Sequence, residues 1–108
     1  MPQNKPTFER LKELARTVIP AGGSVWLYGS RARGDARADS DWDLLILLDK
    51  PERDIHDWDN YAFPFVQKGW DLEEDISART FTKDMWHNGP HSLFYFNVEE
   101  DKKILYES

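Results

Sequence analysis

The sequence contains no cysteine, and this absence excludes a disulfide framework, a cysteine-ligated zinc site and thiol chemistry. It also lacks any apolar run near the roughly 18–20 residues that a membrane-spanning helix needs. Its first residues, MPQNKPTFERLKELA, form no hydrophobic signal core. We therefore expect a cytoplasmic protein that does not bind a membrane.

Several catalytic motifs are missing as well. The chain has no glycine-rich phosphate loop with a lysine, which excludes a P-loop enzyme. It has no Gly-x-Ser-x-Gly elbow, so the usual motif of the serine hydrolases is absent. The histidines form no metal-ligand set, because Asn88, Gly89 and Pro90 break the helical spacing between His87 and His91. We expect no zinc site.

Positive charge is scarce, since 14 lysines and arginines face 20 aspartates and glutamates and leave a net charge of -6. Proteins bind long nucleic acids by neutralising phosphates with lysine and arginine, so we expect no stable binding to a long nucleic acid. The positive charge is concentrated locally, because Arg31, Arg33 and Arg37 lie in one short stretch. These arginines either bind an anionic ligand or balance the aspartates beside them.

At 108 residues the chain has room for one domain, residues 1–108, and not for two. Its hydrophobic spacing predicts strands at 24–28, 42–49, 73–81 and 103–106, and helices at 8–18, 30–34, 52–69, 83–86 and 93–98. We expect Thr7 to cap the first helix. In the third helix, Ile55 begins an apolar stripe, Pro64 interrupts the helix and Gly69 ends it. The fold class is α/β (α+β), a small mixed four-stranded sheet with helices mainly on one face.

The most informative residues are Gly29 and Ser30 and, after ten further residues, Asp41 and Asp43. A Gly-Ser turn at the end of a strand offers backbone N–H groups and a hydroxyl to a phosphate. Two aspartates two positions apart on an extended chain point to the same face and repel unless a cation separates them. Mg²⁺ prefers such oxygen ligands. The pattern predicts a nucleoside triphosphate site, and the alternative is an ordinary turn beside a solvated strand entrance.

This pattern resembles the signature of the nucleotidyltransferase superfamily typified by DNA polymerase β, and within it of the minimal nucleotidyltransferases. The resemblance implies an enzyme that transfers a nucleoside monophosphate, most simply AMP from ATP, to an acceptor hydroxyl. Asp41 and Asp43 would then be catalytic and would hold two Mg²⁺ ions. Ser30 and the backbone at Gly29 would bind terminal phosphate oxygens, and Arg33 would pair with the triphosphate.

The superfamily also uses a third carboxylate on a later strand, and three neighbouring acids are candidates here. Asp75 is favoured as a catalytic residue and metal ligand, because it directly precedes the apolar Ile76. Glu73 is the second choice, whereas Glu74 points to the opposite face of an extended chain. If none of them reaches the metals, the chain binds nucleotide but transfers poorly.

The resemblance further implies a partner protein. Minimal nucleotidyltransferases of this kind are commonly paired with a small helical protein of the HEPN type, and toxin–antitoxin versions adenylylate that partner and silence its RNase activity. We expect no helical domain within these 108 residues that could hold an acceptor. Several aromatic residues exceed what so small a core can bury and favour an exposed interface: Trp58, Tyr61, Phe63, Trp70, Trp86 and Phe96. The alternatives are a nucleotide-binding subunit that masks its partner by docking, and a transferase that modifies a small molecule such as an antibiotic.

Overall fold

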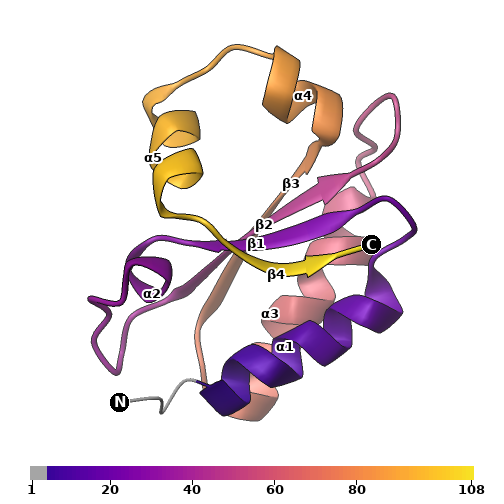
Figure 1. Cartoon of the computed structure of the whole chain (residues 1–108). Coiled ribbons are helices and arrows are strands. Elements are labelled where there is room, and N and C mark those ends of the chain that lie inside the picture. The colour runs from indigo at the N-terminus through magenta and orange to yellow at the C-terminus, as the bar shows by residue number, and fades with distance from the viewer. Residues whose placement is uncertain (1–4) are drawn as a thin grey trace.

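The structure is a computed structural model that describes residues 5–108. At its centre lies one sheet with the strand order β3-β2-β1-β4. Its strands are β1 (Ser24–Tyr28), β2 (Trp42–Leu48), β3 (Ile76–Thr82) and β4 (Lys103–Glu107). Strand β1 is antiparallel to both β2 and β4, whereas β2 and β3 are parallel. The sheet is therefore mixed and four-stranded, as predicted (Figure 1).

The helices divide between the two faces of the sheet. One face is covered by α1 (Lys5–Val18) and α3 (Phe63–Leu72), and α3 continues a π-helical turn, η1 (Trp58–Ala62). The other face carries the shorter α4 (Lys83–Asn88) and α5 (Leu93–Asp101), which pack on it through Trp86 and Val98. A single turn, α2 (Ser30–Arg33), follows β1 directly (Figure 1). The predicted mixed four-stranded α+β fold is confirmed, but the helices cover both faces of the sheet and not mainly one.

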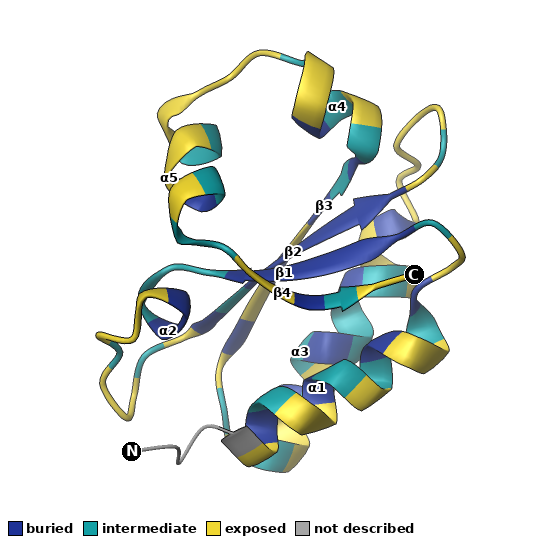
Figure 2. Ribbon diagram, in the orientation of Figure 1, coloured by how far each residue is buried: buried dark blue, intermediate teal, exposed yellow. Residues whose placement is uncertain are grey.

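Strand β2 is central and is buried on both faces (Figure 2). Its even-numbered residues, from Trp42 to Leu48, belong to the core beneath α1 and α3. Leu45 and Leu47 belong instead to the core beneath α4 and α5. Because side chains alternate between the faces of a strand, Asp43 shares the face of Leu45 and Leu47. The sheet thus presents Asp43 on the side where α5 packs.

Aromatic rings fill the space between this face and the two short helices. Trp86 is only 3% exposed, and its ring meets those of Trp26, Phe81 and Phe94 at centroid distances of 6.0, 5.3 and 5.9 Å. Such edge-on aromatic contacts stabilise a small core beyond the area that they bury. The expectation that Trp86 contributes to an exposed interface is therefore wrong.

Several helix boundaries differ from the prediction, and Pro64 lies where the helix type changes and not at a break. Helix α1 begins at Lys5, so Thr7 lies inside its first turn and is not the N-cap; Pro6 fits there because first-turn N–H groups have no intrahelical partner. Ile55 precedes η1 with its side chain 89% exposed, so it does not belong to the apolar stripe. Pro64 lies in the first turn of α3, where the π-helical turn gives way to an α-helix. Within residues 5–108, none of the helices is long and apolar enough to cross a membrane.

Gly69 does not end α3, which continues until Glu73 closes it in the left-handed conformation at φ 58°. Gly69 is required for packing instead, because a Cβ atom there would lie 2.7 Å from the Glu74 carbonyl oxygen and 2.9 Å from the Ile76 side chain. Strand β3 consequently begins at Ile76, three residues later than predicted. The acids at 73–75 form the connection into the strand and are not part of it.

Candidate active site

Strand β1 ends in a sharp turn at Gly29 that leads directly into α2. Gly29 has φ 76° and ψ -159°, a combination that is essentially restricted to glycine. The N–H groups of Ala32 and Arg33 both donate to the Gly29 carbonyl oxygen at 3.0 Å, so the turn and the helix form one unit. Ser30 is the first residue of this helix, where backbone N–H groups have no intrahelical partner. The turn therefore carries the kind of donors that bind a phosphate group.

The carboxylate of Asp43 lies against this turn. Strand pairing places Asp43 directly opposite Tyr28, the residue before Gly29. A Cβ atom added to Gly29 would lie 2.5 Å from Asp43 Oδ2, a separation that real Cβ atoms do not show. A side chain at this position would force the Asp43 carboxylate to move. The fold thus brings the phosphate-binding type of turn and one of the two aspartates into contact.

Asp43 is half-buried, whereas Asp41 is exposed immediately before β2. The pKa of Asp43 is raised above its ordinary value, first by burial and then by the negative charge of Asp41. The positive charges of Arg79 and Arg33 act in the opposite direction but do not outweigh them. This carboxylate pair is therefore short of positive charge, and a bound cation would relieve its repulsion.

The two aspartates fit magnesium as a ligand. Mg²⁺ is usually bound through one or two carboxylates together with substrate phosphates and water, and not by a closed protein cage. Asp41 and Asp43 supply such carboxylates beside a turn suited to phosphate. Among residues 5–108, no three acidic, histidine or cysteine side chains gather closely enough to hold a metal by themselves. The arrangement is thus suited to a metal that arrives with its nucleotide.

The arginines between the turn and the aspartates have different roles. Arg31 is buried, and its guanidinium donates to the carbonyl oxygens of Ala38 (3.1 Å) and Ser40 (2.8 Å) and lies over the Trp42 ring. It therefore fastens the loop that leads to Asp41 and is not available to a ligand. Arg33 is exposed by contrast, and this leaves its guanidinium accessible at the edge of the site.

The candidates for a third carboxylate are spread apart. Asp75 is exposed just before β3, and its carbonyl oxygen accepts a 2.8 Å hydrogen bond from the Trp42 N–H. The parallel register then places Ser77 beside Asp43. Glu74 points to the other face of the sheet, where its carboxylate lies 3.7 Å from the Arg31 guanidinium. The structure thus gives Glu74 a structural partner, and Asp75 is the acid at the strand entrance beside Asp41.

Three residues that the sequence analysis did not single out lie close to the site. Arg79 of β3 pairs with Leu45, so it shares the face of Asp43, and its guanidinium lies 4.6 Å from the centroid of the Phe94 ring. Phe94 in turn packs edge-on against Tyr28 at 5.4 Å. Arg79 and Phe94 are the first two of these residues, and the third is Asp101 at the end of α5, which is paired with Arg33. The alternation of side chains along β3 could have predicted that Arg79 lies on the face of Asp43. No sequence pattern links Asp101 to this site.

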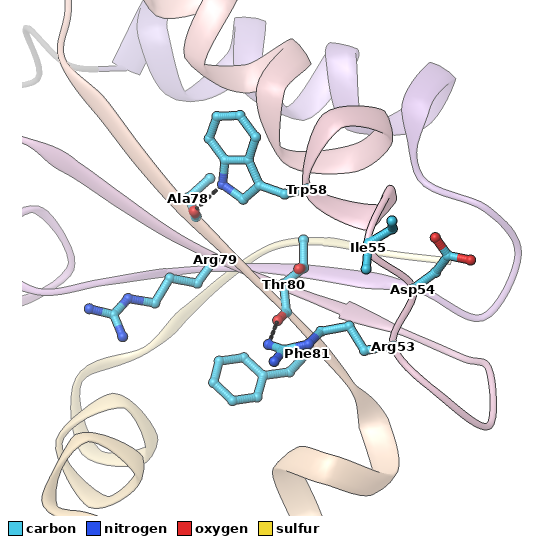
Figure 3. A pocket seen from close by; sticks show the side chains of 8 residues that line it. All are labelled: Arg53, Asp54, Ile55, Trp58, Ala78, Arg79, Thr80 and Phe81. Atoms are coloured by element: carbon cyan, nitrogen blue, oxygen red, sulfur yellow. Dashed lines mark hydrogen bonds between the residues drawn. The ribbon is translucent and has the colours of Figure 1, made fainter.

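A hollow of about 780 Å³ lies along the outer edge of β3, where the chain from Arg53 to Trp58 covers the strand. The Trp58 indole N–H donates to the Ala78 carbonyl oxygen at 3.0 Å, and Arg53 donates to that of Thr80 at 3.2 Å (Figure 3). These contacts protect an exposed sheet edge from pairing with another chain. Arg79 also lines the hollow, and its side chain points away from Arg53 (Figure 3).

The sequence matches the family model described as the nucleotidyltransferase domain over residues 7–105. A curated relative, the protein adenylyltransferase MntA of Aphanizomenon flos-aquae, is 34% identical over 106 residues, which cover 94% of this chain and 70% of the relative.

Solved structures with a similar fold include a toxin–antitoxin complex with AMP-PNP (TM-score 0.65, 20% identity, 94% of this chain and 73% of that one). Another is a tri-AMPylated HEPN toxin of Shewanella oneidensis in complex with an MNT antitoxin (TM-score 0.62, 18% identity, 98% of this chain and 74% of that one). These similarities confirm the fold. Together with the family match, they establish that the chain belongs to the nucleotidyltransferase domain family and is an enzyme of the nucleotidyltransferase class.

Proposed function

We propose that this protein transfers AMP from ATP, with Mg²⁺, to a hydroxyl group of a small helical HEPN-type protein, and that it acts as the antitoxin of such a pair. The contact between the Asp43 carboxylate and the Gly29 turn carries the proposal, because it joins a carboxylate suited to Mg²⁺ to a turn suited to phosphate. The name of the curated relative, protein adenylyltransferase, supports AMP as the transferred group. The AMPylated toxin that accompanies the similar antitoxin supports a protein acceptor.

In this proposal each residue has a separate task. Ser30 and the backbone N–H groups after Gly29 bind oxygens of the terminal phosphates. Arg33 pairs with the triphosphate at the exposed edge of the turn. Asp41 and Asp43 hold Mg²⁺, which when bound neutralises phosphate charge and lowers the pKa of the acceptor hydroxyl. Two such ions are expected from the resemblance to the superfamily.

The reaction is a displacement at the α-phosphorus. The acceptor oxygen forms a new bond to that phosphorus, the bond to the bridging oxygen of the β-phosphate breaks, and pyrophosphate leaves with its electron pair. In this proposal Asp75 takes the proton of the acceptor hydroxyl; its position at the entrance of β3, next to the start of β2, supports this role. Most of the catalytic effect would come from positioning and from stabilising charge as it develops.

We expect the partner to hold the acceptor, because the helices of residues 5–108 pack on the sheet. Exposed aromatic side chains remain for a partner on two parts of the surface. Trp70 on α3 is 63% exposed and Phe96 on α5 is 58% exposed, whereas Tyr61 packs against the core. Phe96 lies on α5, the helix that packs on the same face of the sheet as Asp43.

The experiment is to co-express the chain with the small helical protein encoded beside it, and to weigh that partner after incubation with Mg-ATP. We expect co-purification and a mass increase of one or more adenylyl groups. The matched control is the same pair with Asp43→Asn, which should leave the partner mass unchanged. A partner that neither co-purifies nor gains mass would contradict the proposal.

A second function is favoured by one observation, since no third acid among residues 5–108 gathers with the aspartate pair. The chain could then act as a nucleotide-binding subunit that masks its partner by docking. Co-purification with loss of toxicity but without any added AMP would identify this alternative.

The acids at 73–75 provide the discriminating prediction. We expect Asp75→Ala to lower the rate of AMP transfer at least about tenfold while Mg-ATP affinity changes little, because a proton acceptor acts mainly in the transition state. Glu74→Ala should instead lower the melting temperature, because it leaves the buried Arg31 guanidinium without its nearest carboxylate. If only Glu73→Ala lowers the rate of AMP transfer, Glu73 is the third carboxylate and not Asp75. If none of the three substitutions lowers this rate, the masking subunit is favoured.

A further inference from the structure

Helix α5 ends in three consecutive acids, Glu99, Glu100 and Asp101, and has no basic residue in its last turn. The C-terminus of a helix carries partial negative charge, so acids there are unfavourable. A sequence that breaks a local rule in this way commonly does so for a compensating contact elsewhere. The question is what each of these carboxylates binds.

Glu99 and Asp101 both have close partners, but those of Glu99 lie in or next to the neighbouring helices and that of Asp101 lies in α2. Glu99 accepts from the Trp86 indole N–H and from the Lys102 ammonium, both at 2.7 Å, so it holds α4 and α5 together. Asp101 accepts from Nη1 of Arg33 at 2.9 Å, and its side chain is only 15% exposed. The contact joins residues that are 68 positions apart in the chain. It ties the end of α5 to the single turn of α2 beside the proposed phosphate site.

Without a bonding partner, the Arg33 side chain would be free to move. Arg33 comes from a helix of four residues, its side chain is 46% exposed, and a long arginine side chain loses much rotamer freedom when it is fixed. Its other partner, Asp35, is a weaker anchor, because the bond to Nε is 3.3 Å long and the carboxylate is 62% exposed. These two bonds use one N–H of Nη1 and that of Nε, so the remaining N–H groups of the guanidinium stay available for phosphate oxygens.

We infer that Asp101 is a positioning residue of the active site, which holds the Arg33 guanidinium beside the Gly29 turn in the orientation that binds the triphosphate. The inference rests on the proposed function, in which Arg33 pairs with ATP. Asp101 itself touches no substrate. It organises the arginine before the nucleotide arrives, so less side-chain freedom is lost on binding.

The test uses the chain in complex with its partner, Mg-ATP as the probe, and both ATP affinity by calorimetry and steady-state AMP transfer. We expect Asp101→Asn to raise the KM and the dissociation constant for ATP roughly five- to tenfold, in the range for residues in direct contact, while kcat changes less than about twofold. Arg33→Gln should weaken ATP binding at least as much. Because Asp101 acts through Arg33, the double variant should bind ATP no more weakly than Arg33→Gln alone.

Matched controls separate this role from a general effect of charge or stability. Glu100→Gln removes an exposed charge from the same helical turn and should leave ATP affinity unchanged, and Asp101→Glu should recover part of the loss. Unchanged or tighter ATP binding by Asp101→Asn, or an effect that adds fully to that of Arg33→Gln, would overturn the inference. If the wild-type complex binds Mg-ATP but transfers no AMP, the proposed function fails, and the ATP affinities still decide the role of Asp101.

Discussion

Replacing Asp43 with asparagine is expected to abolish AMP transfer, with a loss of roughly a hundred- to a thousandfold or more, comparable to removal of a principal electrostatic group from an active site. The substitution keeps the size and shape of the side chain but removes the negative charge that would hold Mg²⁺ against the nucleotide. Asp43 Oδ2 is also the atom nearest to the position that a Cβ of Gly29 would take. Transfer is measured by the mass of the partner protein over time.

The same substitution should leave the folded state intact. Burial and the charge of Asp41 raise the pKa of Asp43, so the ionised carboxylate costs folding free energy at neutral pH, and a neutral amide avoids that cost. We therefore expect an equal or higher melting temperature together with lost activity. Asp39→Asn, which removes an exposed charge from the preceding loop, is the matched control and should retain activity. Near wild-type transfer by Asp43→Asn would contradict the assignment of Asp43 as a metal ligand.

The parts of the site that follow from the sequence are those that depend on local structure. Gly29 and Ser30 follow one strand, Asp41 and Asp43 flank the start of the next, and alternation alone puts the two aspartates on one face. Hydrophobic spacing was sufficient to place β1, β2 and β4 nearly to the residue. A short-range pattern with strong periodicity therefore predicted both the fold class and the centre of the candidate site.

The parts that could not be predicted depend on long-range packing. The sequence does not distinguish the three arginines of this stretch. In the structure Arg31 is buried and donates to two carbonyl oxygens of the following loop, whereas Arg33 is exposed. The start of β3 was misplaced because Gly69 resembles a helix end, whereas it allows close packing against Ile76. The pairing of Arg33 with Asp101 has no sequence signal, because it depends on where α5 returns to the sheet.

Gly29 offers the second prediction with a large effect. We expect Gly29→Ala to lower AMP transfer roughly a hundredfold, because its Cβ would lie 2.5 Å from Asp43 Oδ2 and displace the carboxylate, and a displacement of about 1 Å at an active site can cost that much. The backbone at φ 76° and ψ -159° also disfavours any side chain, so we expect a loss of about 1–3 kcal/mol in the free energy of unfolding. Urea denaturation measures this loss.

Two further variants distinguish backbone strain from displacement of the carboxylate. Gly34→Ala also places a side chain at positive φ, 88°, but its Cβ would meet no atom within 4 Å, so it should lower stability modestly and leave transfer nearly unchanged. Combining Gly29→Ala with Asp43→Ala removes the clash and should recover part of the lost stability without recovering activity. If Gly29→Ala transfers AMP as fast as the Gly34 variant, the close approach of Asp43 to the turn is not required for catalysis. If the double variant is no more stable than Gly29→Ala alone, the destabilisation comes from the backbone, and the carboxylate does not contribute to it.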